Sequence, residues 1–220
     1  MRALITGSSS GIGCATAKLF LERGIEVIGL DIKESTIEHD SYTHIITDIS
    51  NKSSLPELEP IDYLINNAGV QDSVDDIAIN LKGTINVTEK YGIREGIKSI
   101  LNVASASAHT GAEFPYYSAS KGGMLSYTKN VAIRVAKFGA TCNSISPGGV
   151  TTELNKPVME DKALWDDIMR VTPLKKWASA EEIAEWIYFL TVINKSCTGE
   201  DILIDNGEAH LNATFVWPEN

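Results

Sequence analysis

The stretch Arg2-Ala3-Leu4-Ile5-Thr6-Gly7-Ser8-Ser9-Ser10-Gly11-Ile12-Gly13 decides the fold of this chain. Its apolar start predicts a short buried strand, its glycines predict a tight turn, and the apolar-periodic residues that follow predict a helix. Glycine lets the backbone approach a phosphate without a Cβ clash, and the free N–H groups at a helix start attract an anion. We expect a pyrophosphate to contact Gly7, Ser9, Ser10, Gly11, Ile12 and Gly13.

The spacing of the glycines excludes two common kinds of nucleotide-binding turn. Gly7, Gly11 and Gly13 do not follow G-x-G-x-x-G, and the turn lacks the Lys-Ser/Thr ending of an ATP-binding phosphate loop. The turn is therefore a different variant of a dinucleotide-binding turn. Taken alone, a glycine cluster is equally well explained by turn geometry.

A second predicted strand, residues 25–30, ends at Asp31, which lies 24 residues after Gly7. A carboxylate at this strand tip can accept hydrogen bonds from both ribose hydroxyls of an adenosine, and it repels the extra phosphate of NADP. The turn offers no Arg or Lys to pair with that phosphate. These features favour NAD, although an Asp after a strand is also a common turn former.

Two further predicted strands end in small or polar residues. Residues 44–47 run into Asp48 and Ile49, and residues 62–65 run into Asn66-Asn67-Ala68-Gly69. The carboxyl ends of parallel strands share one sheet edge, where a ligand sits in an open α/β sheet. We expect Asp48 to hold the adenine amino group, with Ile49 beside it, and Asn67, Ala68 and Gly69 to lie close to the adenosine ribose.

Tyr117 and Lys121 are four residues apart, so a helix places both side chains on one face. A free tyrosine has a pKa of about 10, and its use near pH 7 needs about 4 kcal/mol in favour of the phenolate. A cation about 4 Å away supplies this only in a partly enclosed cleft. The pair alone is also typical of a solvated helix face, so the catalytic interpretation depends on the other motifs.

Six motifs follow one another along the chain: Thr6 to Gly13, Asn66 to Gly69, Asn80, Ser105, Tyr117 to Lys121, and Pro147-Gly148-Gly149-Val150-Thr151-Thr152. In this order they resemble the short-chain dehydrogenase/reductase family over nearly the whole chain. The resemblance implies a single domain over residues 1–220, with a Rossmann-like α/β fold. Its doubly wound parallel sheet would lie between helical layers (α/β/α), and the cofactor would be a nicotinamide dinucleotide.

The resemblance also implies a catalytic tetrad of Asn80, Ser105, Tyr117 and Lys121. Tyr117 would transfer the substrate proton, and Ser105 would hydrogen-bond the substrate oxygen. Lys121 would lower the Tyr117 pKa and hold the nicotinamide ribose, while Asn80 would keep a water that links Lys121 to solvent. Asn80 could instead be an ordinary buried helix asparagine.

The later motifs concern the nicotinamide and the substrate. By resemblance, Pro147 and Gly148 turn the chain toward the cofactor, and Val150 and Thr152 bind the nicotinamide amide. Residues 153–177 resemble the substrate-covering segment, and their apolar spacing predicts a short amphipathic helix. A helix packed against the core is the alternative. His109 lies between Ser105 and Tyr117, where it borders the substrate or sits in an exposed loop.

The chain is short for the family. Only 13 residues separate Asn67 from Asn80, and only 17 separate Asp31 from Asp48, so we expect shortened helices after strands 2 and 4. We hypothesise a more open pocket and an altered oligomer. The tail, residues 209–220, carries Phe215, Val216 and Trp217, which would pack on a neighbouring subunit or on this one.

The composition fits this interpretation. A net charge of −10 over 220 residues argues against nucleic acid or an anionic membrane as partner. The first strand begins at the start of the chain, no apolar run spans a bilayer, and the three cysteines have no metal-like spacing, so we expect a cytoplasmic protein without a bound metal. By resemblance we expect a homodimer or homotetramer.

The leading prediction is an NAD-dependent enzyme that acts on an alcohol or ketone. An NADP-dependent 3-oxoacyl reductase is the nearest alternative among enzymes. A catalytically weak NAD-binding regulatory or assembly protein is the alternative from another class, since the pocket is trimmed. The substrate itself is set by pocket shape, which one sequence does not define.

Overall fold

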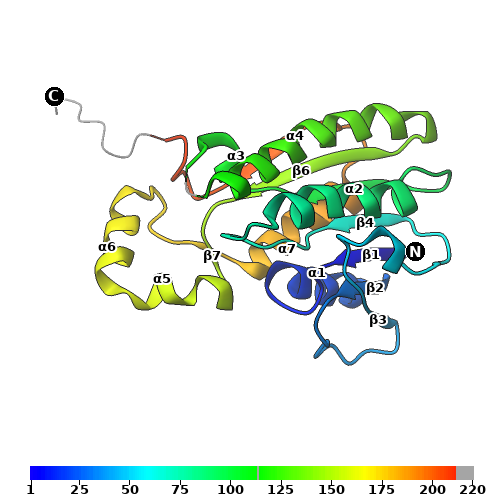
Figure 1. Ribbon diagram of the computed structural model, residues 1–220, viewed down its shortest axis with the longest axis horizontal. Helices are drawn as coiled ribbons and strands as arrows, with labels where there is room; N and C mark the ends of the chain where they lie inside the picture. The colour runs from blue at the N-terminus through cyan, green and yellow to red at the C-terminus, as the bar shows by residue number, and fades with distance from the viewer. Residues whose placement is uncertain (113, 212–220) are drawn as a thin grey trace.

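The computed structural model describes residues 1–112 and 114–211, and its centre is a seven-stranded parallel sheet (Figure 1). The strand order is β3-β2-β1-β4-β5-β6-β9. The strands are β1 (Arg2–Thr6), β2 (Glu26–Asp31), β3 (Tyr42–Ile46), β4 (Tyr63–Asn66), β5 (Ser99–Val103), β6 (Thr141–Pro147) and β9 (Asp201–Ile204). The order reverses between β1 and β4, where an open α/β sheet forms its ligand crevice. The predicted Rossmann-like fold is confirmed.

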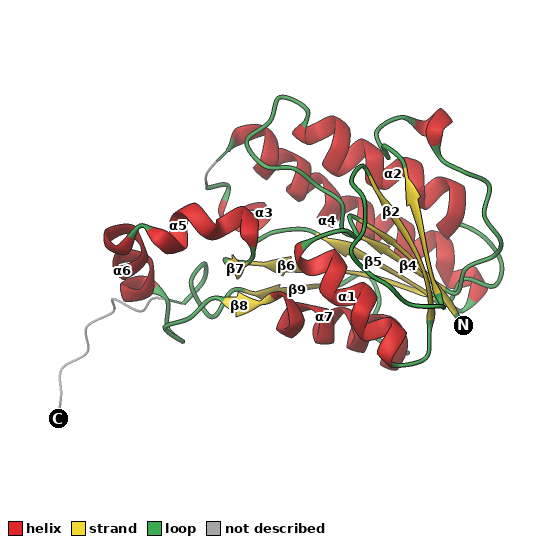
Figure 2. Ribbon diagram, turned by 90° about the horizontal axis from the view of Figure 1, so that it is seen from below, coloured by secondary structure: helices red, strands yellow, loops and turns green. Residues whose placement is uncertain are grey.

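Helices cover both faces of the sheet (Figure 2). On one face lie α1 (Gly11–Glu22) and α7 (Ala180–Tyr188), and on the other lies α4 (Pro115–Val135) beside a helix in three parts, η2 (Ile77–Gly83), α2 (Thr84–Val87) and η3 (Thr88–Gly92). The parts η2 and η3 are π-helical, a rare conformation that is frequent at functional sites. The shorter elements are η1 (Lys52–Ser54), α3 (Ser107–Thr110), η4 (Ala136–Phe138), β7 (Val150–Thr151), η5 (Glu153–Asn155), α5 (Lys156–Glu160), α6 (Lys162–Val171), β8 (Ala178–Ser179) and η6 (Phe189–Ile193).

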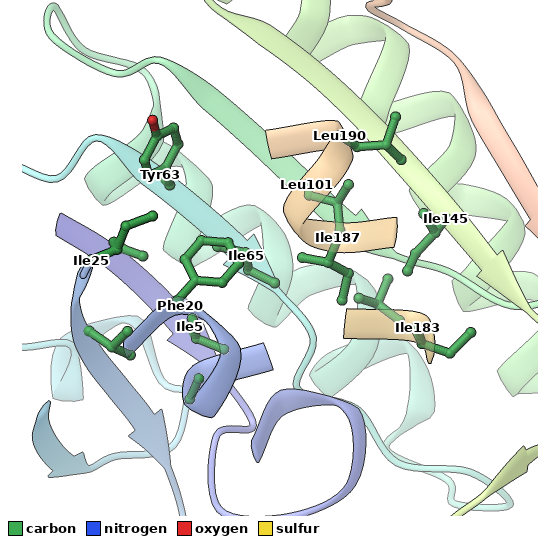
Figure 3. Packing of buried hydrophobic residues seen from close by; sticks show 14 of the residues in the cluster. Ile5, Phe20, Ile25, Tyr63, Ile65, Leu101, Ile145, Ile183, Ile187 and Leu190 are labelled. Atoms are coloured by element: carbon green, nitrogen blue, oxygen red, sulfur yellow. The ribbon is translucent and has the colours of Figure 1, made fainter. Parts of the chain in front are cut away.

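Successive side chains of a strand point to opposite faces of the sheet, so they pack in two separate hydrophobic clusters. Ile5 packs toward α1 and α7, whereas its neighbour Leu4 packs toward α4. Phe20 of α1 lies in the first cluster, with its ring edge-on to Tyr63 at 6.4 Å between centroids (Figure 3). Its ring also meets Tyr188 edge-on, at 5.5 Å. The two clusters cover opposite faces of the sheet.

The connections are short, as the residue spacing predicts. Residues 32–41 between β2 and β3 contain no helix, and η1 is the one helical turn between β3 and β4. After β4 the chain re-enters a helix at Ile77. The helix after strand 2 is therefore absent, as the shortening predicts. The helix after strand 4 is continuous over residues 77–92, so on that side only the link of residues 67–76 is short, and the link after strand 3 is short as well.

Residues 153–177 form two short helices, α5 and α6, which project from the body beyond the paired strands β7 and β8 (Figure 1). Neither helix has a buried residue, so the alternative of a helix packed against the core is wrong. The tail residues Phe215, Val216 and Trp217 lie outside the described residues. Within the described ranges, no helix is long and apolar enough to cross a membrane.

Candidate active site

Tyr117 and Lys121 lie one turn apart on α4, which Pro115 starts. The Lys121 ammonium is 5.6 Å from the centroid of the Tyr117 ring. Its Nζ donates a 2.8 Å hydrogen bond to the carbonyl oxygen of Val103, the last residue of β5. The phenol and the ammonium are thus held together at the carboxyl end of the sheet.

Lys121 is almost completely removed from water, with 4% of its surface exposed. Burial lowers its pKa from 10.5 to about 8, and the nearby negative charge of Asp76 opposes that fall. The ammonium form of Lys121 therefore predominates at neutral pH, but its pKa of about 8 lies only a little above that pH. In this enclosed position its charge acts on Tyr117 with little screening by solvent.

Ser105 follows β5 and is 8% exposed. The backbone around it is fixed to β6, since Ala104 N–H donates to Ile145 O at 2.7 Å and Ala106 N–H donates to Pro147 O at 2.8 Å. Its hydroxyl accepts a 3.2 Å hydrogen bond from Ser107 N–H, which leaves the hydroxyl proton available for another acceptor.

Asn80 is fully buried in η2, where it connects three segments. Its Oδ1 accepts from Val70 N–H at 2.8 Å, and its Nδ2 donates to Val70 O at 2.9 Å and to Ser120 Oγ at 3.1 Å. A Cβ on Gly69 would lie 3.0 Å from Asn80 Oδ1 and 3.5 Å from Lys121 Nζ. The structure therefore brings Asn80, Gly69 and Lys121 together.

The glycine turn packs tightly against the end of β4. A Cβ on Gly13 would lie 2.0 Å from Gly7 O, and a Cβ on Gly7 would lie 2.8 Å from Ala68 Cα. Asn67 Nδ2 donates to Gly7 O at 3.1 Å, which ties the two segments. Gly7 and Gly11 also have positive φ angles, of 68° and 52°, so both positions favour glycine.

Asp31 is oriented by two backbone donors. Ser9 N–H donates to its Oδ2 at 2.9 Å and Lys33 N–H to its Oδ1 at 3.0 Å. Each carboxylate oxygen keeps a further lone pair. Beside Gly29 of the same strand, Ser8 Oγ, Tyr42 OH and His44 Nδ1 form a hydrogen-bonded chain with distances of 3.1 and 3.0 Å.

Asp48 and Ile49 follow β3 and take different positions. Asp48 is exposed and its Oδ1 accepts from Ser50 N–H at 2.8 Å. The Ile49 side chain is buried, 5% exposed, in the cluster toward α4, and it fills the space beside Gly83. Of this pair, Asp48 is the side chain that faces solvent at the strand tip.

Residues 147–152 form the wall opposite the glycine turn. A Cβ on Gly11 would lie 3.5 Å from Thr152 Cγ2, so these two segments face each other. Pro147 ends β6, and Gly148 packs on Asp205. The Val150 side chain points into the core, and its carbonyl already accepts from Thr152 N–H at 2.9 Å and Asn155 Nδ2 at 2.8 Å.

Trp177 anchors the projecting helices. The backbone of Gly149 packs directly on its indole, because a Cβ there would lie 1.9 Å from Cε2. Trp165 of α6 meets the same ring edge-on, with 5.0 Å between centroids, and Trp177 Nε1 donates to Glu208 Oε2 at 3.3 Å. The segment is thus held at its base rather than along its length.

His109 has a structural contact that its sequence position does not reveal. It lies in α3, and its Nε2 is 2.7 Å from Asp201 Oδ2 and 3.3 Å from Ser146 Oγ. The ring therefore ties the segment after Ser105 to β6 and β9. It does not sit in an unattached loop.

Sequence reasoning missed Asp76, a carboxylate that is 1% exposed and whose charge acts on Lys121. Its signal is the four-residue spacing to Asn80, which puts both on nearly one helix face. Within residues 1–112 and 114–211, no group of three His, Cys, Asp or Glu side chains has the arrangement of a metal site.

The residues present fit a dinucleotide. The first turn of α1 carries no acidic residue, so its N–H groups favour an anion at the glycine turn. The oriented carboxylate of Asp31 lies at the tip of β2, and Lys121 lies at the tip of β5. The tips of β1 and β4 lie between them in the sheet.

Comparison with known proteins agrees with this geometry. A family model described as enoyl-(acyl carrier protein) reductase matches residues 7–208. The 3-oxoacyl-[acyl-carrier-protein] reductase of Thermotoga maritima is 33% identical over 237 residues, which cover 93% of this chain and 96% of that protein. An NAD-dependent glycerol dehydrogenase of Listeria innocua is 32% identical and covers 93% of this chain and 92% of its own length.

A solved structure shares the fold closely. A 4-hydroxyisoleucine dehydrogenase mutant, complexed with NADH and succinate, superposes with a TM-score of 0.86 at 28% identity. The match covers 96% of this chain and 100% of that one.

Proposed function

This chain belongs to the short-chain dehydrogenase/reductase family, and from that membership we propose that it is an NAD-dependent oxidoreductase that interconverts an alcohol and a ketone, with Tyr117 as general acid and base. One observation carries the proposal. The Tyr117 ring lies 5.6 Å from a buried ammonium at the carboxyl end of the sheet, on the same edge as the glycine turn. A cation in that position is what a phenol needs to release its proton near neutral pH.

Each tetrad residue has a step in the proposed reaction. A bound nicotinamide would accept or supply the hydride. Tyr117 takes the alcohol proton in oxidation and returns it in reduction, while Lys121 favours the phenolate. Ser105, held beside β6 by its flanking backbone, donates its hydroxyl proton to the substrate oxygen. Asn80 fixes the Val70 backbone and Ser120 around Lys121.

The cofactor preference is assigned to Asp31. Two backbone N–H groups hold its carboxylate, so the charge cannot swing away from the position that a ribose 2′-oxygen would take. Ribose hydroxyls can donate to it, whereas a 2′-phosphate is repelled. This argument favours NAD over NADP and counts against the NADP-dependent 3-oxoacyl reductase as the closest alternative.

We propose that residues 153–177 cover the bound substrate. The helices α5 and α6 have no buried residues and are anchored at Trp177, so they present their apolar side chains outside the core. A segment held only at its base can close over a bound substrate. The Thr152 and Gly11 walls would then face the cofactor beneath it.

We also propose that the protein is a homodimer or homotetramer. Three apolar residues on α7 and the η6 turn that continues it are exposed on the surface, Trp186 of α7 at 42%, and Phe189 and Ile193 of η6 at 46% and 55%. Their spacing of three and four residues puts them on one side of the helix. The described chain buries none of them, and a second copy would do so.

The test of the function is Tyr117→Phe. We expect it to lose nearly all turnover, by about 10²-fold or more, because the phenol proton is gone while the ring remains. The assay follows absorbance of the reduced nicotinamide with NAD or NADP and a panel of secondary alcohols, sugars, steroids and acyl thioesters. NAD binding, measured by calorimetry, should stay close to that of the native protein.

Tyr116→Phe is the matched control, because this neighbouring tyrosine is 58% exposed. It should keep full activity. Substantial activity in Tyr117→Phe would assign proton transfer to another group. Tight NAD binding by the native protein without turnover of any panel compound would favour the regulatory or assembly alternative.

A further inference from the structure

Asp76 is a buried carboxylate that the reaction described above does not use. It lies immediately before η2 and is 1% exposed. Its Oδ1 accepts a 3.3 Å hydrogen bond from Ser73 N–H, but its Oδ2 has no hydrogen-bond partner among the described residues. A buried charge is costly unless an opposite charge or hydrogen bonds compensate it. Such a group therefore needs a compensating partner close by.

A row of buried polar residues runs along the helix from Asp76. The row consists of Asp76, Asn80, Thr84 and Thr88, each four residues from the last and each at most 1% exposed. The helix part η2 packs against α4, where Asn80 meets Ser120, the residue before Lys121. Asp76 is the one charged member of this row, and it lies at the end nearest the tetrad asparagine.

The buried ammonium of Lys121, in turn, needs a negative charge close by. The Lys121 side chain is buried, and the acceptor of its hydrogen bond, Val103 O at 2.8 Å, is uncharged. An ammonium has three N–H donors, so two remain for other partners. The charge of Asp76 favours the protonated lysine and opposes the effect of burial.

Other ionisable groups on the elements packed against α4 face elsewhere. The η2 residue Lys82 is exposed, and His109 of α3 contacts Asp201 and Ser146. The Cys142 thiol of β6 is fully buried in the cluster toward α4, and burial raises its pKa. On α4 itself, Tyr117 is the ionisable group beside Lys121.

We propose that Asp76 is a positioning residue that keeps Lys121 protonated, and so keeps a positive charge beside Tyr117. The inference rests on the proposed function, in which that charge makes Tyr117 usable as a base. Asp76 touches neither substrate nor cofactor, and it acts through the lysine alone.

Asp76→Asn tests this inference, because it removes the charge and keeps an acceptor for Ser73 N–H. Its matched control is Asp75→Asn, which removes the same charge from the exposed neighbour. Lysine side chains labelled with ¹⁵N and ¹³C report the titration of Lys121 by NMR, and Lys121→Met identifies the signal. The Lys121 midpoint should fall by about one pH unit in Asp76→Asn and stay unchanged in Asp75→Asn.

A second readout is the pH profile of kcat/KM with the substrate found by the panel. Its high-pH limb should move to lower pH in Asp76→Asn, and Asp76→Glu should restore it in part. A purely structural role would lower activity without moving the limb. If Asp76→Asn does not fold, Asp76→Ser, which also keeps an acceptor for Ser73, replaces it.

An unmoved Lys121 midpoint in a folded Asp76 variant would overturn the inference. The NMR titration needs no substrate or turnover. The NMR result therefore tests the role of Asp76 independently of the proposed function. The proposed function is tested by the substrate panel, and it fails if no compound reacts.

Discussion

Lys121 is an ammonium that the fold has removed from water. Because its pKa falls from 10.5 to about 8, retaining its proton at pH 7 costs the folded chain about 3 kcal/mol relative to the unfolded one. Between pH 8 and 10.5 the unfolded chain binds more protons, so this cost shrinks as the pH rises through that window. Charges buried at such a cost are concentrated at functional sites.

Asp31 should decide between the two nicotinamide cofactors. We expect Asp31→Asn to lower the NAD-over-NADP preference in kcat/KM by about tenfold or more, equivalent to about 1.4 kcal/mol. The neutral amide no longer repels a 2′-phosphate, and it donates as well as accepts. Initial rates with both cofactors measure the preference.

Glu34→Gln is the control for that experiment. It removes the same charge from an exposed position three residues away. The preference should not change there, and an equal change in both variants would mean that net charge, rather than the ribose contact, sets cofactor choice. A native protein that prefers NADP would contradict the assignment outright.

At the scale of elements, the site depends on short contacts between pieces distant in sequence. The turn after β1 fits against the tip of β4 only because Gly7 and Gly13 lack side chains. The projecting helices α5 and α6 depend in the same way on Gly149, whose backbone packs against the Trp177 ring. The Trp177 indole is therefore one of the contacts that hold the segment at its base.

Trp177→Ala should weaken substrate binding and leave cofactor binding unchanged. Removing the ring takes away the surface on which both Gly149 and Trp165 rest, so α5 and α6 lose their anchored position. We expect KM for the substrate to rise by about tenfold, the effect of roughly 1.4 kcal/mol of lost positioning. Steady-state kinetics give KM, and calorimetry gives the NAD affinity.

Leu174→Ala serves as the control, since Leu174 belongs to the same segment and is 66% exposed. It should leave KM unchanged. An equal loss of NAD affinity and substrate affinity in Trp177→Ala would indicate general unfolding of the site rather than displacement of the covering segment.

At the scale of the whole molecule, the short connections between strands bear on how copies of the chain associate. The short link after strand 2 lies on the α1 side of the sheet, where Ile37 packs. The links after strands 3 and 4 lie on the α4 side, while α7 and η6 expose an apolar row. Contiguous exposed apolar residues mark interaction surfaces. The hypothesis of an altered oligomer therefore becomes specific, with α7 rather than α4 in the contact.

Trp186→Glu should dissociate the oligomer, because a carboxylate would be buried without a partner at the centre of the proposed contact. Analytical ultracentrifugation should show a dimer or tetramer for the native protein and a smaller species for the variant. Ile133→Glu, at a residue of α4 that is 78% exposed, should leave the assembly intact. Dissociation by Ile133→Glu alone would assign the contact to α4 and refute the altered oligomer.

Much of the fold and part of the site follow from the sequence alone. The strand, turn and helix of residues 2–22, and the single turn between Tyr117 and Lys121, depend on side-chain period and on glycine, which act over a few residues. The family motifs extend this local information to the order of the strands. The shortened connections follow from the residue count between Asp31 and Asp48 and between Asn67 and Asn80.

Only the tertiary structure decides which distant groups meet. It sets Asp76 near Lys121, His109 against Asp201, and Trp177 beneath Gly149, although 45, 92 and 28 residues separate these partners in the sequence. The period of a helix or strand says which side of an element a residue occupies. Which neighbour faces that side depends on packing between elements, where burial of apolar surface and the compensation of buried charge act over the whole chain.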